Sequence, residues 1–181
     1  MDILTDIEEF ARQAHGGQQR KFADEPYIEH PIRVMQLCRE YTSDLPVLSA
    51  ALLHDILEDT AVTKDALSNY LRKVMKPKDA QRAFTLTVEL TDVYVKEHYP
   101  DWNRRKRKAA ETARLGKVSA AAQTIKYADI IDNTLDISSS SSDFKPKFLH
   151  ECRSMLNVMD KGNPDLRKRA IATVNSFLQT K

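Results

Sequence analysis

Apolar side chains recur every three or four positions along most of the chain, and this spacing predicts amphipathic helices. The apolar stripes run through residues 3–14, 34–41, 48–52, 118–128, 148–159 and 166–178. Pro31 and Pro46 suit first helical turns, and Asn163 with Pro164 suits the cap and first residue of a further helix. The chain has only four glycines and no Asn-Gly hairpin dipeptide, so a sheet is not expected. We predict an all-α fold of about seven to nine helices.

Three segments interrupt the periodicity without marking a domain boundary. Residues 15–29 contain adjacent glycines and a proline and are predicted to form a loop. Residues 92–108 mix aromatic and basic side chains, and residues 138–142 are a serine run typical of a mobile or helix-capping connection. Residues 1–181 are therefore expected to form a single compact domain.

The composition describes a chain that can build a core without disulfides. It has 28 basic and 26 acidic residues, a net charge of +2 and 41% hydrophobic residues. Cys38 and Cys152 lie among apolar residues and are predicted to be buried thiols. The acidic N-terminus does not resemble a signal peptide, and no apolar run reaches the roughly 20 residues of a membrane span. We expect a cytoplasmic protein with no membrane partner, and the small net charge argues against a dedicated nucleic-acid binder.

The most informative stretch is residues 50–60, where an apolar helical run abruptly carries polar side chains. On a continuous helix, His54 and Glu58 lie four residues apart, as do Asp55 and Asp59, so all four share one side. Three carboxylates without a basic neighbour repel one another, and burial would add a desolvation cost. A divalent cation would remove this cost.

Two further polar residues fit such a cation. His30 stands where the predicted loop enters the second helix, and Asp129 interrupts an apolar helical stripe. Asp129, Asn133 and Asp136 follow the i, i+4, i+7 spacing and form one polar line. A mixed set of histidines and aspartates suits Mn, Fe or Zn better than calcium, which prefers oxygen ligands alone.

Three ordered motifs resemble those of the metal-dependent HD-domain phosphohydrolases, in particular the hydrolase domain of the RelA/SpoT-type alarmone enzymes. Residues 20–31, Arg-Lys-Phe-Ala-Asp-Glu-Pro-Tyr-Ile-Glu-His-Pro, are similar to the family's Arg-Lys…Pro-Tyr-x-x-His-Pro motif. Residues 51–60 and 126–133 resemble its His-Asp-x-x-Glu-Asp and Lys-x-Ala-Asp-x-x-x-Asn motifs. The resemblance implies a single HD domain with its motif core over residues 11–136 and C-terminal helices over 144–179. Because 181 residues leave no room for a synthetase, it also implies a small stand-alone hydrolase of the Mesh1-like kind.

The same resemblance assigns the acids and histidines of these motifs to one catalytic centre. The implied metal ligands are His30, His54, Asp55 and Asp129. Glu58 and Asp59 match the acids that activate and orient the attacking water. The implied cofactor is Mn²⁺ or another divalent ion, and the implied reaction is 3′-hydrolysis of (p)ppGpp, which releases pyrophosphate and leaves GDP or GTP.

Basic side chains are expected to meet the charge of the nucleotide substrate. The resemblance implies that Arg20 and Lys21 pack against the guanine base and that Asn133 contacts the sugar side. Residues 104–108 are consecutive cations that wind around a helix, so at most about two or three can face one site. Arg104 and Lys108 are the candidates for phosphate contact.

Two departures from the family pattern leave the substrate open. Residues 130–132 are Ile-Ile-Asp where relatives usually carry a basic residue followed by Leu, and Asp136 stands where many long relatives carry Thr. One alternative is therefore an HD phosphohydrolase of an adenine alarmone, of the NADPH 2′-phosphate or of another nucleotide phosphate. A second alternative, from another class, is an inactive nucleotide-sensing or RNA-associated protein that uses residues 104–108. The intact set of ligands and acids favours an enzyme, and the oligomeric state stays open.

Overall fold

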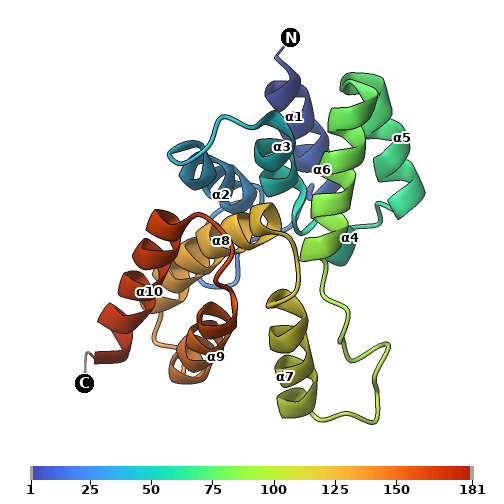
Figure 1. Ribbon diagram of the computed structural model, residues 1–181. Helices are drawn as coiled ribbons and strands as arrows, with labels where there is room; N and C mark the ends of the chain where they lie inside the picture. Colours follow the sequence, from blue (N-terminus) through green and yellow to red (C-terminus); the bar gives the residue numbers. More distant parts are fainter. Residues whose placement is uncertain (1, 180–181) are drawn as a thin grey trace. The chain divides into compact units, whose positions relative to one another are not determined.

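The computed structural model describes residues 2–179, and these contain ten α-helices and no strand apart from one isolated bridge between Gln19 and Pro26 (Figure 1). The helices are α1 Ile3–Ala14, α2 Glu29–Arg39, α3 Leu45–Leu53, α4 Ile56–Asp59, α5 Lys64–Val74, α6 Pro77–Leu90, α7 Arg104–Leu115, α8 Ala120–Ser138, α9 Lys145–Val158 and α10 Pro164–Gln179. The all-α prediction is confirmed. Over the same described residues, no helix combines the length and apolarity needed to cross a membrane.

The chain divides into two compact units, Met1–Thr91 and Asp92–Lys181. Helices α1 to α6 belong to the first unit and α7 to α10 to the second. The single domain expected for residues 1–181 stays a prediction, and its ends, Met1 and residues 180–181, lie outside the described residues.

Helix α3 forms the centre of the first unit. It packs against α1, α2 and α6, and α5 packs on α6. Every residue from Pro46 to Leu53 is buried, because this segment carries no charged side chain and therefore has no face suited to water. The one hydroxyl in this stretch, Ser49, donates to the Leu45 carbonyl at 2.8 Å, so the helix satisfies its own polar group.

The predicted loop between the first two helices is confirmed and is held by its own contacts. Gly17 adopts φ +79°, a left-handed conformation in which a side chain would be strained. Arg33 on α2 pairs with Glu25 in the loop, with nitrogen to oxygen distances of 2.7 and 3.0 Å. The loop thereby reaches the start of α2 in one defined path, which places His30 at the second position of that helix.

Helix α8 forms the centre of the second unit, where it packs against α9 and α10, and α7 packs on α9. Tyr127 on α8 is fully buried, and its hydroxyl donates to the Met159 carbonyl at 2.8 Å. The predicted cap of α10 is confirmed, since Asn163 Oδ1 accepts from the backbone nitrogens of Asp165 and Leu166, both at 3.0 Å. These contacts fix the turn between α9 and α10 against α8.

Two smaller expectations also hold. The serine run begins at the last residue of α8, and the hydroxyls of Ser139 and Ser140 donate to carbonyls of the last helical turn, each at 2.7 Å. Cys38 and Cys152 are buried and form no disulfide. Burial, reinforced by the charge of Asp129, raises the pKa of the Cys152 thiol to about 12, so this thiol stays protonated and unreactive.

Gly162 lets the turn before α10 lie directly on α8. A Cβ atom at this position would stand 2.5 Å from Cε2 of Tyr127 and 2.9 Å from the backbone nitrogen of Thr124. Because Tyr127 is buried and hydrogen-bonded, it cannot move aside cheaply, so Gly162→Ala is expected to lower the free energy of unfolding by about 1–3 kcal/mol. Urea denaturation measures this loss. Asp160→Ala, at an exposed position of the same turn, is the control and should stay within about 0.5 kcal/mol of the wild type; equal losses in both variants would contradict the steric argument.

Candidate metal centre

His54 and Asp55 lie at a break between two helices. α3 ends at Leu53, His54 keeps helical dihedral angles of φ −59° and ψ −33°, and Asp55 changes to φ −98° and ψ −3° before α4 begins at Ile56. The expectation of one continuous helix through residues 50–60 is therefore wrong. Neighbouring side chains on a continuous helix point about 100° apart, whereas the break lets Nε2 of His54 approach Oδ2 of Asp55 to 3.0 Å.

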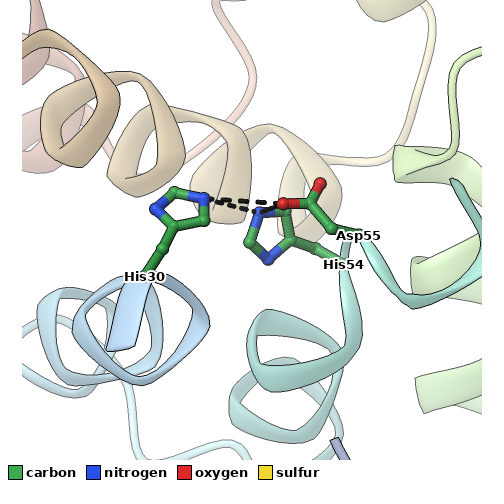
Figure 2. A group of neighbouring side chains, drawn as sticks. All are labelled: His30, His54 and Asp55. Atoms are coloured by element: carbon green, nitrogen blue, oxygen red, sulfur yellow. Dashed lines mark hydrogen bonds and ion pairs between the residues drawn. The ribbon is translucent and has the colours of Figure 1, made fainter. Parts of the chain in front are cut away.

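Three of the predicted metal ligands meet at this break (Figure 2). The Nε2 atoms of His30 and His54 lie 3.2 Å apart, and Oδ2 of Asp55 lies 3.6 Å from Nε2 of His30. Both imidazoles are buried, and the Asp55 side chain is 19% exposed. All three candidate ligand atoms fall within 4.8 Å of one another. The cluster therefore offers two nitrogens and one carboxylate oxygen to a common point.

The hydrogen bonding of His54 determines which ring nitrogen can bind a metal. Its Nδ1 lies 2.8 Å from the carbonyl oxygen of Ala51, and because a carbonyl only accepts, Nδ1 carries the proton. In the neutral imidazole, Nε2 then holds the lone pair, and this atom faces His30 and Asp55. A lone pair opposite a carboxylate is repulsive unless His54 gains a second proton or a cation lies between them. A divalent metal fits this donor set, since neutral imidazole nitrogen and ionised carboxylate are its ordinary ligands.

The charge state of Asp55 suits the same role. Burial by itself would raise the pKa of this carboxyl, but the charges and hydrogen bonds of His54 and His30 hold the pKa well below its ordinary value. The carboxyl is therefore ionised at neutral pH, which is the form that binds a metal.

Tyr27 connects this cluster to Asp59. Its hydroxyl lies 2.6 Å from Oδ2 of Asp55 and 2.8 Å from Oδ2 of Asp59. Burial and then the charges of Asp55 and Asp59 raise the pKa of Tyr27 above its ordinary value, so the hydroxyl keeps its single proton for one carboxylate at a time. Tyr27 is absent from the predicted site residues; its position three residues before His30, in the turn that enters α2, is the signal that could have found it.

Glu58 and Asp59 occupy the short helix α4, and both are exposed residues. Their backbone nitrogens donate to the Asp55 carbonyl at 3.0 and 2.9 Å, which ties the helix to the break. Partial burial of the Asp59 carboxyl and the charge of Asp55 raise the pKa of Asp59, while its hydrogen bond with Tyr27 acts in the opposite direction. The predicted roles of both acids toward water stay predictions.

Arg20 and Lys21 each lie over an aromatic ring of the loop before α2. Cζ of Arg20 is 5.5 Å from the centre of the Tyr27 ring, and Nζ of Lys21 is 5.3 Å from that of Phe22. Arg20 therefore borders the Tyr27 side of the cluster, and Lys21 is exposed. Their contact with a base stays a prediction.

Asp129 and Asn133 lie in the second unit, on α8. Asp129 is buried, its Oδ2 lies 2.7 Å from Nζ of Lys126, and its Oδ1 accepts from Nδ2 of Asn133 at 2.6 Å. The i, i+4 spacing of Asp129 and Asn133 thus brings their side chains into contact. The assignment of Asp129 as a metal ligand and of Asn133 as a nucleotide contact stays a prediction.

The Lys126–Asp129 pair tests whether burial increases the contribution of an ion pair to the free energy of unfolding. Its side chains are 18% and 6% exposed, whereas those of the similarly spaced Lys168–Asp165 pair are 78% and 72% exposed. Lys126→Met removes a cation from beside a buried carboxylate, so in EDTA it should lower the free energy of unfolding by about 1–3 kcal/mol. Lys168→Met is the matched control, expected to cost less than about 0.5 kcal/mol by urea denaturation. Similar costs at the two sites would contradict this reasoning.

The basic run at residues 104–108 begins α7. Arg104, Arg107 and Lys108 line one pocket of about 230 Å³ together with Lys96. These three residues of the run follow the i, i+3, i+4 spacing of one helical face, which is why they line the same pocket.

Both predicted phosphate contacts of α7 already have acidic partners. Nη2 of Arg104 lies 2.7 Å from Glu151, and Nζ of Lys108 lies 3.2 Å from Asp92. The four side chains are between 21% and 41% exposed, so these pairs are worth little energy in water and can be shared with an anion. Phosphate binding by Arg104 and Lys108 stays a prediction.

The HD-domain family model matches residues 8–155, which is most of the chain and includes residues of both compact units. This chain belongs to the HD-domain family. The family implies a divalent metal, and the convergent His30, His54 and Asp55 fit one. The fold expected from the sequence motifs is thereby confirmed.

Relatives of this HD-domain protein include much longer chains. It is 30% identical over 152 residues to a guanosine-3′,5′-bis(diphosphate) 3′-pyrophosphohydrolase of Borreliella burgdorferi, covering 81% of this chain and 20% of that protein. A protein of the same name from Vibrio cholerae is 53% identical over 57 residues, which are 32% of this chain and 8% of the relative. The chain thus spans a fifth or less of the length of these relatives.

A solved structure shows the same fold at nearly equal length. It is that of a metazoan orthologue of SpoT, described as hydrolysing ppGpp, and it matches with a TM-score of 0.77 and 22% identity. The match covers 99% of this chain and 95% of that one.

Proposed function

We propose that this HD-domain protein is a Mn²⁺-dependent 3′-pyrophosphohydrolase of (p)ppGpp that acts in the cytoplasm, releases pyrophosphate and leaves GDP or GTP. The observation that carries the proposal is the convergence of His30, His54 and Asp55 at the helix break. The motifs that contain these residues resemble those of alarmone hydrolases, and 152 residues of the chain are 30% identical to a protein named for this reaction.

The residues of the first unit would divide the work of hydrolysis. His30, His54 and Asp55 would hold the ion, with the Ala51 carbonyl keeping the His54 lone pair directed at it. The bound metal supplies charge neutralisation at phosphoryl oxygens and a lowered water pKa. Glu58 would accept a proton from the attacking water, and Asp59, held by Tyr27, would orient that water.

Residues of both units are proposed to act on the metal and the nucleotide. Arg20 and Lys21 would pack against the guanine base, which suits side chains that already lie over aromatic rings. In the second unit, Arg104 and Lys108 would meet phosphate, Asn133 would contact the sugar side, and Asp129 would complete the metal ligands. Charge supports the phosphate role, since the pocket beside the start of α7 is lined by four cations against two acids, Asp92 and Glu97.

A substrate panel tests the proposal. The protein is loaded with Mn²⁺, Mg²⁺ or Zn²⁺, or kept in EDTA, and incubated with ppGpp, pppGpp, an adenine alarmone, NADPH and GTP. Anion-exchange chromatography identifies the products. We expect pyrophosphate and GDP from ppGpp with Mn²⁺ and no turnover in EDTA. Release of phosphate from NADPH, or turnover of the adenine alarmone alone, would show that the substrate is not a guanosine alarmone. Nucleotide binding without turnover in any metal would indicate a sensor.

A further inference from the structure

His15 is a buried histidine without a role in the proposed chemistry. It follows the last residue of α1, and its side chain lies in an enclosed position, 3% exposed. Its Nδ1 lies 2.8 Å from Oε1 of Gln18, and its ring stacks on Tyr27 with 4.8 Å between centroids and 24° between planes. Its Nε2 has no hydrogen-bond partner among residues 2–179. One face of the His15 ring therefore contacts Tyr27, and one ring nitrogen contacts Gln18.

The hydrogen bonds from His15 to Asp59 have a single consistent direction. The backbone carbonyl of Asp59 only accepts, so the Gln18 atom that lies 2.5 Å from it must be the amide nitrogen. Oε1 of Gln18 then faces His15, and because this oxygen only accepts, Nδ1 of His15 must carry a proton. Gln18 thus selects the Nδ1–H tautomer of His15 when the ring is neutral.

These contacts close into a ring around Asp59. Gln18 holds its backbone carbonyl at the end of α4, and the Tyr27 hydroxyl lies 2.8 Å from its carboxylate. The Tyr27 ring in turn stacks on His15, and the Tyr27 backbone nitrogen donates to the Gln18 carbonyl at 3.0 Å. Asp59 is therefore held at both its main chain and its side chain, and His15 takes part in both restraints.

We propose that His15 is a positioning residue, which acts through Gln18 and Tyr27 to hold Asp59 where it can orient the attacking water. The inference rests on the proposed function, because that function gives Asp59 its role. A displacement of about 1 Å in a catalytic geometry costs on the order of a hundredfold in rate. The hydrogen bond of His15 should therefore affect turnover more than metal affinity, since Gln18 reaches Asp59 and not the ligand side chains.

Three variants separate the hydrogen bond from the ring. His15→Phe keeps an aromatic ring and removes the donor, Gln18→Met keeps the length and removes the amide, and His15→Asn keeps a donor close to the position of Nδ1. We expect the first two to lower kcat by about ten- to a hundredfold, with the Mn²⁺-induced rise in melting temperature unchanged. His15→Asn should retain at least about three times the kcat of His15→Phe. The double variant, His15→Phe with Gln18→Met, should have a kcat no lower than that of the less active single variant, because both substitutions remove the same hydrogen bond.

The control is Gln13→Met, which removes an exposed α1 amide that donates to Glu9 at 2.9 Å. It should leave kcat unchanged. A kcat within about twofold of wild type in His15→Phe and Gln18→Met would overturn the proposal, as would a matching loss of the Mn²⁺-induced stabilisation.

Two measurements on the whole protein are independent of turnover. Long-range ¹H–¹⁵N spectra with Mg²⁺ should show His15, assigned by its absence in His15→Asn, as the Nδ1–H tautomer in wild type and less so in Gln18→Met. Hydrogen exchange at the Asp59 amide should be faster in Gln18→Met, because the end of α4 loses its restraint. The Nε2–H tautomer of His15 in wild type, or an unchanged exchange rate of the Asp59 amide in Gln18→Met, would show that His15 and Gln18 do not restrain Asp59. A wild type inactive on every nucleotide would refute the proposed function, while these spectra would still decide whether His15 and Gln18 hold Asp59.

Discussion

Asp55→Asn is expected to weaken Mn²⁺ binding by more than about a hundredfold and, with it, to abolish hydrolysis. Replacing residues that only support a metal ligand already costs about 10- to 100-fold in affinity, and Asp55 is the single carboxylate of the described cluster. Its Oδ2 lies 3.0 Å from Nε2 of His54, so a neutral amide would remove the negative charge beside the imidazole nitrogens that helps to hold a divalent ion. The substitution keeps the size of the side chain, so the loss reports charge and not packing.

Metal content and thermal unfolding measure this effect together. A ligand that binds only the folded state at 100 times its dissociation constant stabilises it by about 2.7 kcal/mol, so Mn²⁺ should raise the melting temperature of the wild type but not of Asp55→Asn. Asp65→Asn, at an exposed position in the first turn of α5, is the matched control and should respond like the wild type. If Asp55→Asn kept its full metal content after gel filtration, Asp55 would not be a metal ligand.

Local sequence signals predicted most of the helices because those signals act over one or two turns. The cap at Asn163 and the loop containing Gly17 depend on neighbouring residues alone, and both were predictable. The break at residues 54–55 was not predictable in this way, since Leu53-His54-Asp55-Ile56 contains neither glycine nor proline. The buried stretch Pro46–Leu53 of α3 packs against three neighbouring helices just before this break, and no local sequence pattern predicts such packing.

The candidate centre was predictable only where a motif carried it. His30, His54 and Asp55 belong to the recognised motifs, and they converge as expected. The hydrogen bonds around them were not predicted, because these bonds join positions far apart in the chain. Tyr27 reaches an acid 32 positions away and Gln18 a carbonyl 41 positions away, and helical periodicity carries no information on such pairs.

Glu58→Gln is expected to lower kcat by about 10²- to 10⁴-fold, the usual contribution of a general base. The amide keeps the shape of the side chain but cannot accept a proton from water, so KM and the Mn²⁺-induced rise in melting temperature should stay at their wild-type values. Glu9→Gln, on an exposed face of α1, is the control for a change of net charge and should leave kcat unaltered. A Glu58→Gln enzyme with kcat within about threefold of wild type would assign the base to another residue, with Asp59→Asn the next variant to measure. Loss of the Mn²⁺ response in Glu58→Gln would instead make Glu58 a metal ligand, because a group that only receives a proton contributes nothing to the binding of the ion.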